Sequence, residues 1–487
     1  MPSPNLSVAS APALVPSNGH ANGVSRRSLL KRYEDDEIHD LVCVGFGPAS
    51  LAIAVAMHDV LRDRQPGLRT QQPKIRFLEK QAQFRWHAGM ILSGTKMQIT
   101  FIKDLATLRN PRSEFTFLNY LHEKGRLVQF TNLGTFLPQR IEYEDYMKWC
   151  ASWFEDVVDY SQDVRSVEAG PTLNGVVDHF QVVSRNWATG EFSTLKAKHV
   201  VIAAGGKPNI PKSLSLPHPR IIHSSQYATH VSELFPQGTA PQSVAVIGAG
   251  QSAAEVFDNI PSRFPEAKCH LLIRGSALRP SDDSPFVNEI FDPERVEDVY
   301  HQSPDVRARE LHKDKGTNYS VVRLELLEHI YSMLYSYRIR YRSEEEWPQQ
   351  ILTHRTVTGV EPCKGHGLRL HIRNESGTYS AAKQSGNETL DVDLVVVASG
   401  YRRDAHEDML RNIEHLRSTK SDRWTVTRDY GVEFADGKVQ SDAGVWLQGC
   451  NEASHGLSDS LLSILAIRGG EMVNSIFKGA GSLADDL

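Results

Sequence analysis

The sequence predicts an α/β protein made of two doubly wound units, with the second unit inserted in the first. Near residue 45 a short buried strand, a glycine turn and a periodic helix follow one another, and the same order returns near residue 248. Alternating apolar segments between and after these units indicate sheet meanders. The chain has 487 residues, which at about 150 residues per domain suits two to three domains.

The first unit starts near Asp40. The pattern predicts a buried strand over 41–44, a helix over 49–62 and a second strand over 74–79. The polar residues 63–73 are typical of a loop. Together these elements form the beginning of a βαβ unit.

The second unit repeats this order, with a strand over 243–247, a helix from Gln251 and a strand over 270–273. Residues 207–211, Lys-Pro-Asn-Ile-Pro, are typical of a linker. Four more segments have the pattern of strands, namely 180–184, 195–203, 368–372 and 394–398.

Residues 1–36 are rich in Ser, Pro, Ala, Asn and Gly and show no apolar period. Such a segment buries too little surface to offset its ordering entropy, so we expect a disordered N-terminal tail. It contains no basic-then-apolar secretory pattern.

Composition excludes several functional classes. The net charge of −5 argues against a nucleic-acid or anionic-membrane binder, which would carry an excess of basic residues. The five cysteines lie far apart without a CxxC pair or zinc spacing, so we expect no metal site, disulfide scaffold or dithiol centre. The longest apolar run, 41–57, is interrupted and too short for a membrane span. We expect a cytoplasmic protein.

The first glycine turn, Gly45 to Ser50, has the form G-x-G-x-x-S. In such a turn the first glycine makes the bend, and the second lets backbone amides approach a pyrophosphate at the helix N-terminus. The following strand ends in Glu79, whose carboxylate can accept hydrogen bonds from ribose hydroxyls. An ordinary strand-to-helix turn is the alternative, but the flanking strands favour the ADP half of FAD.

The second turn, 248–253, has the form G-x-G-x-x-A, and its following strand ends in Arg274 instead of an acid. An arginine at this place can pair with a 2′-phosphate, which favours NADPH over NADH. Two dinucleotide sites on one chain indicate electron transfer from NADPH through a flavin. Because no CxxC acceptor is present, oxygen is the expected electron acceptor.

With these motifs the chain resembles the fungal L-ornithine N5-monooxygenases, flavin-dependent N-hydroxylases of hydroxamate siderophore biosynthesis. The matching residues fall between Asp40 and Phe477, in the motifs 40–52, 96–107, 281–289 and 455–460. Residues 393–406 resemble the family signature D-x3-(L/F)-A-T-G-Y-x4-(H/P), with Val397 and Ser399 as small departures.

The sequence pattern places the domain boundaries near 215 and 398. We therefore expect an FAD-binding domain over 37–215 and 398–487, and an NADPH-binding domain over 216–397 with a substrate-binding insertion around 276–345. The resemblance implies contacts to FAD from Gly45, Gly47, Ser50, Glu79, Lys80, Gln83, Trp86, His87, Gln98, Val164, Leu457, Ser458 and Asp459. It implies contacts to NADPH from Ala249, Gly250, Gln251, Ser252, Arg274 and Asn318.

The substrate set that the resemblance implies is Lys103, Asn288, Glu289, Ile290, Phe291, Asn318 and Ser460. Lys103 suits the ornithine carboxylate, and the asparagines and the serine suit its amines. Read alone, each has a structural alternative: a solvated charge at Lys103, a loop cap at Asn288, a turn residue at Asn318 and a helix N-cap at Ser460. Likewise Trp86 alone would be a core residue. Residues 458–477 begin like a capped helix that could face the flavin.

The resemblance further implies that NADPH reduces FAD, that dioxygen gives a C4a-hydroperoxyflavin, and that the ornithine amine attacks it. No residue is assigned as a general acid or base. An L-lysine N6-hydroxylase remains an alternative, because one methylene changes binding by only about 1–3 kcal/mol. A non-catalytic flavin and NADPH redox sensor is an alternative of another class. The resemblance also implies a homotetramer.

Overall fold

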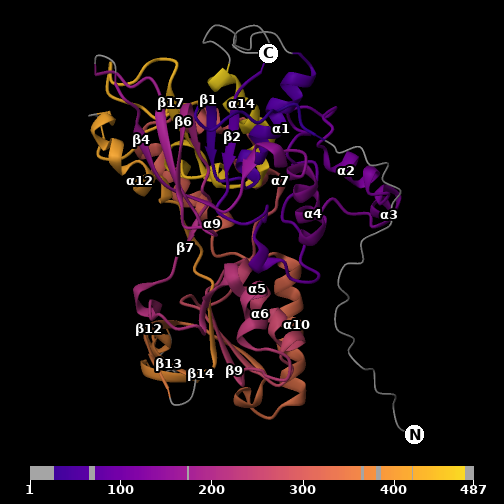
Figure 1. Cartoon of the computed structure of the whole chain (residues 1–487). Coiled ribbons are helices and arrows are strands. Elements are labelled where there is room, and N and C mark those ends of the chain that lie inside the picture. The colour runs from indigo at the N-terminus through magenta and orange to yellow at the C-terminus, as the bar shows by residue number, and fades with distance from the viewer. Residues whose placement is uncertain are drawn as a thin grey trace.

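The computed structural model describes residues 27–64, 72–172, 175–363, 367–379, 385–418 and 421–477. These residues form two α/β bodies, the upper and the lower body in Figure 1, which meet at a waist. The chain passes the waist in an antiparallel pair of short strands, β7 (Lys207–Pro208) and β16 (Tyr401–Arg402). Part of the predicted linker 207–211 is therefore a strand.

The upper body is built on one sheet with a parallel centre in the order β3-β2-β1-β6. Beyond β6 the sheet divides, because the first half of this long strand pairs with β5 and its second half with β17. The strands are β1 (Ile38–Val44), β2 (Ile75–Leu78), β3 (Val158–Asp159), β4 (Gln162–Ala169), β5 (Phe180–Asn186), β6 (Phe192–Ile202) and β17 (Gly444–Leu447).

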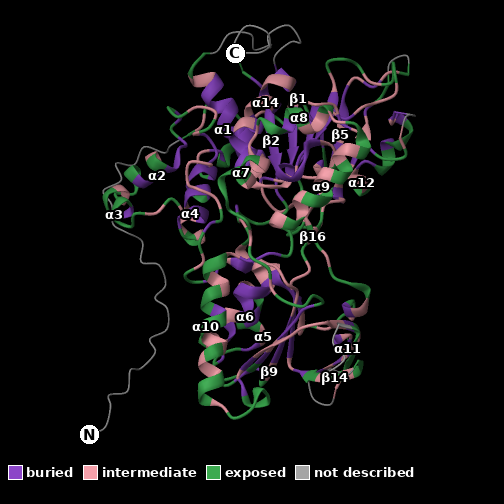
Figure 2. Ribbon diagram, turned by 180° about the vertical axis from the view of Figure 1, so that it is seen from behind, coloured by how far each residue is buried: buried purple, intermediate pink, exposed green. Residues whose placement is uncertain are grey.

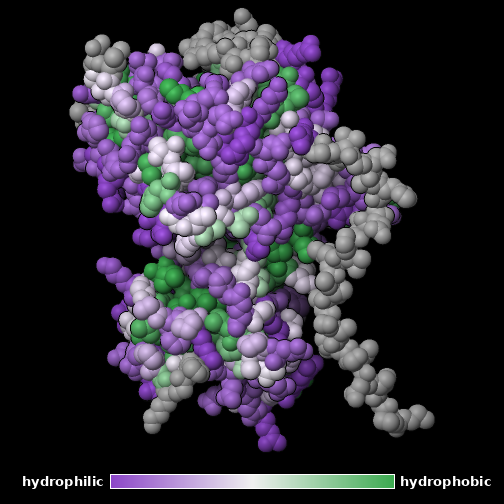
Figure 3. All heavy atoms as spheres, in the orientation of Figure 1, coloured by the Kyte–Doolittle hydropathy of each residue, from purple (hydrophilic) through white to green (hydrophobic). Residues whose placement is uncertain are grey.

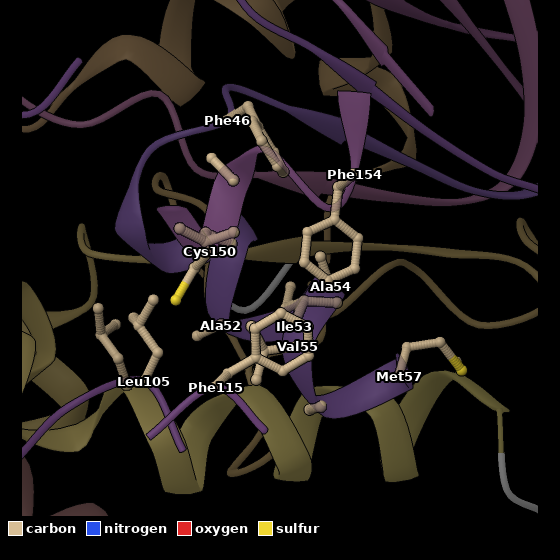
Figure 4. Close-up of a cluster of buried hydrophobic side chains, with 14 of the residues drawn as sticks. Phe46, Ala52, Ile53, Ala54, Val55, Met57, Leu105, Phe115, Cys150 and Phe154 are labelled. Carbon is tan, nitrogen blue, oxygen red and sulfur yellow. The ribbon is translucent and has the colours of Figure 1, made fainter. Parts of the chain in front are cut away.

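Two apolar helices cover one face of this sheet. Helix α1 (Pro48–Arg62) is buried over most of its length and packs on α14 (Leu465–Phe477). Figure 4 shows the core beside α1, where Phe115 and Phe154 approach its residues. The remaining helices of this part are α2 (Phe117–Glu123), α3 (Leu127–Asn132), α4 (Arg140–Ala151), α12 (Ala405–Met409) and α13 (Glu452–His455).

The lower body contains a five-stranded parallel sheet in the order β11-β10-β9-β15-β8. Its strands are β8 (Ile221–His223), β9 (Ser243–Ile247), β10 (Lys268–Leu272), β11 (Gln349–Leu352) and β15 (Leu394–Val397). Helices α5 (Tyr227–Leu234), α6 (Gln251–Arg263) and α10 (Leu324–Arg340) pack on one face. The antiparallel meander β12 (Arg355–Pro362), β13 (Leu368–Asn374) and β14 (Gly386–Val392) covers the other.

The two-residue period of β9 explains how its sheet is buried on both faces. Val244 and Val246 join the core under the helices, whereas Ala245 joins the core under the meander. This is why the segment reads as a continuous apolar run. The predicted α/β fold with two Rossmann-like domains is confirmed, and so are the predicted strands and helices at both glycine turns.

The segment between β10 and β11 leaves the lower body and returns. Helices α7 (Pro285–Asn288), α8 (Arg295–His301) and α9 (Pro304–Asn318) lie against the upper body, while α10 runs along α6 (Figure 1). Tyr300 Oη donates to the carbonyl of Val426 at 3.2 Å, and Lys315 Nζ lies 2.9 Å from Glu452. The region expected to bind substrate thus joins the two bodies.

Two sequence expectations need correction. Of the predicted tail, residues 1–26 lie outside the described residues, but 27–36 are folded, because Leu30 is buried and Lys31 forms a bridge with Lys74. The predicted capped helix over 458–477 begins only at Leu465. Before it lie two 3₁₀ turns, η8 (Leu457–Ser460) and η9 (Leu462–Ile464), separated by the extended residue Leu461.

The remaining short elements are α11 (Ser376–Tyr379), η1 (Ala88–Met90), η2 (Glu155–Val157), η3 (Lys212–Leu214), η4 (Ser224–Gln226), η5 (Glu289–Phe291), η6 (Glu344–Glu346) and η7 (Arg411–Leu416). Among the described residues, none of the helices has the length and hydrophobicity needed to cross a bilayer. Within the same residues, no group of three or more His, Cys, Asp and Glu side chains could hold a metal ion.

Candidate functional site

The first glycine turn joins β1 to α1 and leaves an open cradle. Gly45 has a φ of +91°, and a Cβ there would lie 2.7 Å from the carbonyl oxygen of Ala203, so only glycine fits. A Cβ on Gly47 would meet no atom within 4 Å. No side chain caps the N-terminus of α1, which carries a partial positive charge. Open space and uncapped amides fit a pyrophosphate.

Glu79 stands beside this turn, directly after β2. Its buried carboxylate accepts hydrogen bonds from the backbone N–H of Phe46 at 2.7 Å and of Gln81 at 2.8 Å. These bonds fix the side chain between the turn and the strand end. Because a carboxylate has about four acceptor positions, it can still accept from ribose hydroxyls.

The other residues expected to contact FAD differ in how far they are buried. Trp86 is half-buried with its ring 6.0 Å from that of Tyr143, so it packs at the edge of the core. Val164 belongs to β4 and is buried in the core. Exposed positions are found for Gln83, His87, Gln98 and Lys80, and Lys80 Nζ lies 3.2 Å from Asp163. The contacts of these residues to FAD therefore stay predictions.

Asp459 has an internal partner for each carboxylate oxygen. Its Oδ1 lies 2.9 Å from Arg468 Nη1, and both side chains are almost fully buried. Its Oδ2 accepts from the backbone N–H of Asn451 at 2.7 Å. The side chain thus holds the turn that carries Leu457 and Ser458, and its expected contact to FAD stays a prediction.

His455 ends α13, shortly before this turn, and is a neutral imidazole. It is buried against Tyr430, with ring centroids 4.3 Å apart, and its Nε2 lies 3.0 Å from the carbonyl oxygen of Arg428. Burial lowers the pKa of His455 to about 4. The imidazole therefore carries no charge at neutral pH and serves as a packing group.

The second glycine turn joins β9 to α6. Gly248 has a φ of +144°, and a Cβ there would lie 2.4 Å from the carbonyl oxygen of Ala398. No side chain caps the N-terminus of α6. The turn contains Ala249 and Gly250, and Ser252 lies in the first turn of α6. This is the arrangement expected for a phosphate-binding turn.

Two side chains near this turn have different surroundings. Arg274 is exposed just after β10, and the turn touches the end of that strand because Gly248 N–H donates to Leu272 at 3.2 Å. Gln251 is occupied at both ends of its amide: Nε2 donates to Glu255 at 2.8 Å, and Oε1 accepts from the N–H of Arg323 at 2.9 Å. Its side chain organises the helix terminus.

Lys103 lies in a loop that Asp104 holds in place. The buried Asp104 carboxylate accepts from the N–H groups of Ala106, Thr107 and Phe117, and burial raises its pKa. Lys103 itself is 20% exposed, and its Nζ lies 3.4 Å from Asp292 Oδ1. The lysine is thus a partly buried cation with one long ion pair, available to a carboxylate.

Three segments that the sequence singled out meet at this place. Asp292 follows the turn Glu289–Phe291, whose last carbonyl accepts from Ser463 Oγ at 3.1 Å. On the other side, Tyr319 Oη donates to Glu452 at 2.6 Å, which brings the end of α9 to the segment before Ser460. The Lys103 loop, the insertion and the 457–463 segment therefore converge.

The remaining substrate candidates differ in position. Asn318 is the last residue of α9 and half-buried, so it is a helix end and not the turn residue of the structural alternative. Asn288 is exposed and donates to the carbonyl of Asp283 at 3.0 Å, which matches its alternative as a loop cap. Ser460 ends η8 and does not cap a helix. A cavity of about 360 Å³ lies between α9 and this turn, with Ile290, Leu457 and Ser458 in its wall.

This arrangement has a counterpart among known proteins. A family model described as L-lysine 6-monooxygenase/L-ornithine 5-monooxygenase matches residues 37–403. The chain belongs to this family. The matched residues include both glycine turns, the Lys103 loop and α9, so the family assignment covers most of the site described above.

Relatives and solved structures of this monooxygenase family agree along nearly the whole chain. The L-ornithine N(5)-monooxygenase of Cochliobolus heterostrophus is 55% identical over 474 residues, which are 93% of this chain and 89% of that protein. The ornithine hydroxylase PvdA from Pseudomonas aeruginosa superposes with a TM-score of 0.80 at 34% identity, covering 90% of this chain and 99% of its own. The Kutzneria sp. 744 ornithine N-hydroxylase, solved with reduced FAD, NADP⁺ and L-ornithine, gives 0.79 at 33% identity with the same coverage.

Sequence reasoning about this family member missed the residues that support the site. Asp104, Asp292 and Arg468 received no role, yet they hold the Lys103 loop, pair with Lys103 and fix the Asp459 turn. Only Asp104 could have been found from the sequence around it, because an Asp side chain often accepts hydrogen bonds from backbone N–H groups two or three residues later. The other two find their partners through the packing of distant segments.

Proposed function

We propose that this chain hydroxylates the N5 nitrogen of L-ornithine with NADPH, FAD and O2, giving N5-hydroxyornithine for siderophore biosynthesis. The observation that carries the proposal is the convergence of the Lys103 loop, the insertion and the 457–463 segment at one place. Membership of the family and the FAD, NADP⁺ and L-ornithine of the Kutzneria relative support it.

The cofactors fit the residues present. FAD would be held by the open first turn and Glu79, and NADPH by the second turn and Arg274. When bound there, FAD would carry out the transfer of one oxygen atom of O2 to the amine. NADPH would donate the two electrons, and the second oxygen atom would leave as water. Apolar residues gather at the waist on the face seen in Figure 3.

The residues of this chain must also prepare the amine. A free alkyl amine has a pKa of about 10.4, so only about one molecule in a thousand is neutral at pH 7.4. Partial burial of the amine beside neutral groups such as Asn318 and Ser460 would lower that pKa, because desolvation disfavours the charged form and so favours the nucleophilic one. Lys103 near the carboxylate end adds a positive charge that acts in the same direction.

The test is NADPH oxidation by the FAD-loaded protein with detection of hydroxylamine product. Ornithine should stimulate oxidation and yield the hydroxylamine, and lysine should yield much less. Equal product from lysine would indicate an N6-hydroxylase. Oxidation that no amino acid affects would favour a redox sensor.

Removal of the cation at Lys103 should impair substrate binding selectively. Lys103→Ala loses a charge-assisted contact worth about 1.5–3 kcal/mol, so the KM for ornithine should rise about 10- to 100-fold. FAD content and reduction of the flavin by NADPH should persist. The measurement is steady-state product formation against ornithine concentration, and an unchanged KM would refute the role of Lys103.

Asn318 should raise the amount of hydroxylated ornithine that forms per NADPH oxidised. An asparagine can donate and accept at once, and alanine can do neither, so Asn318→Ala leaves two partners unsatisfied at a cost of about 1–3 kcal/mol. Less hydroxylated ornithine should form per NADPH, with the difference appearing as hydrogen peroxide. Paired assays of both products at saturating ornithine check this, and full coupling in the variant would show that Asn318 only ends α9.

We also propose a homotetramer in the cytoplasm. One face of α10 carries four apolar side chains that are more than half exposed, namely Leu324, Tyr331, Tyr335 and Ile339. Figure 2 shows the outer side of α10 largely exposed. Such a face favours contact with another copy of the chain.

The five cysteines, all free thiols, suit a reducing compartment such as the cytoplasm.

The α10 face can be tested directly. Tyr331→Glu combined with Ile339→Glu should reduce the assembly to a smaller species, because a buried apolar contact would receive charges. Light scattering after gel filtration measures the mass. Phe192→Glu, at an exposed aromatic residue of the upper body, is the matched control and should leave the mass unchanged. An unaltered mass for the double variant would exclude this face from the assembly.

A further inference from the structure

A buried ion pair joins the two bodies at the waist. Arg140 begins α4 in the upper body, and Glu255 lies one turn into α6 in the lower body (Figure 1). Nη1 and Nη2 of the guanidinium donate to the two carboxylate oxygens at 2.6 and 2.7 Å. The side chains are only 13% and 5% exposed. Such a bidentate pair fixes both the distance and the orientation of its partners.

On the upper side, Arg140 is tied to the segment expected beside the flavin. Its backbone N–H donates to the carbonyl of Thr95 at 2.9 Å, three residues before Gln98. Its Nη1 also approaches the carbonyl of Met90 at 3.4 Å. Met90 and Leu92 are buried in the core of the lower body, although they belong to the first half of the chain. The segment 90–98 is therefore held against both bodies.

On the lower side, Glu255 is tied to the second glycine turn. Its Oε1 accepts from Nε2 of Gln251, the first residue of α6, at 2.8 Å, and the other end of that amide accepts from the N–H of Arg323. The chain of bonds thus runs from the 90–98 segment to the helix terminus expected to bind the NADPH pyrophosphate. Neither partner of the pair is expected to touch a cofactor.

We propose that Arg140 and Glu255 are positioning residues that set the NADPH turn of α6 against the flavin segment for hydride transfer. The proposal rests on the proposed function. In this step NADPH gives one hydrogen with two electrons to FAD and leaves as NADP⁺, so its rate depends steeply on the distance between donor and acceptor. A displacement of about 1 Å can lower such a rate about 100-fold.

The test compares Glu255→Gln with a matched control, Glu388→Gln. Glu388 forms a bidentate pair with Arg355 at 2.9 and 3.0 Å, but both residues lie within the lower body. Anaerobic stopped-flow reduction of the FAD-loaded proteins gives the limiting rate with NADPH and with NADH. Glu255→Gln should lower both limiting rates about 10- to 100-fold by the same factor, and the control should leave them unchanged.

A second measurement is independent of activity. In the cofactor-free protein, hydrogen exchange should become faster at 95–98 and at 251–254 in Glu255→Gln, but not in Glu388→Gln. Arg140→Lys keeps the charge and loses the two-pronged geometry, so it should behave like Glu255→Gln. Parent-like rates and exchange in Glu255→Gln, or full activity in Arg140→Lys, would overturn the positioning role.

These outcomes separate the two proposals. A parent protein that binds FAD and is not reduced by NADPH would contradict the proposed function. A parent that is reduced normally, together with a Glu255→Gln variant reduced at the same limiting rate, would contradict the positioning role alone. Because Arg274 is expected to act only on NADPH, an equal loss with NADH identifies an effect of position and not of phosphate recognition.

Discussion

Arg468→Ala should lower the free energy of unfolding by about 3–5 kcal/mol. Arg468 and Asp459 form an ion pair in which both side chains are almost fully buried, and Arg468 Nη1 also donates to the backbone carbonyl of Asp459. Removing the guanidinium leaves a buried carboxylate that, within the described part of the chain, keeps the Asn451 N–H as its partner. The loss should also loosen the turn that carries Leu457 and Ser458, so FAD content should fall.

Chemical denaturation measures the change in stability, and absorbance of the bound flavin measures the FAD content. Arg411→Ala is the control, because this arginine pairs with Asp408 while 69% exposed, and an exposed pair contributes about 0–1 kcal/mol. Equal stabilities for the two variants would show that the buried pair contributes no more than a surface pair.

Arg274→Ala should weaken the use of NADPH and spare NADH. Arg274 is exposed at the end of β10, beside the second glycine turn, where a guanidinium can pair with a 2′-phosphate. Loss of that charge-assisted contact costs about 1.5–3 kcal/mol, which raises the NADPH concentration for half-maximal flavin reduction about 10- to 100-fold.

Flavin reduction at varied concentrations of each coenzyme checks this prediction. Arg263→Ala provides the comparison, because Arg263 lies at the far end of α6 and its guanidinium donates to Ser232. It should change neither coenzyme. If Arg274→Ala weakened NADPH and NADH to the same degree, the phosphate contact would be wrong and a general effect on the turn would replace it.

The elements around both turns could be predicted because their signals are local. A glycine with positive φ, a short β-branched strand and a helix with an apolar period are encoded within about 20 consecutive residues. Gly45 and Gly248 show this directly, since each is required by a carbonyl oxygen of the neighbouring strand end. The helix expected from 458 was wrong for the opposite reason. Asp459 turns inward to Arg468 and does not cap a helix.

The sequence by itself therefore determined the two Rossmann-like units, their turns and the identity of the residues at the strand ends. Only the tertiary structure decided which side chains face one another. Arg140 and Glu255 are 115 residues apart, and Lys103 and Asp292 are 189 apart. Their pairing depends on how two separately folded bodies and an insertion pack together. No local pattern encodes that packing, because a charged residue has the same local signal whether it meets solvent or a partner.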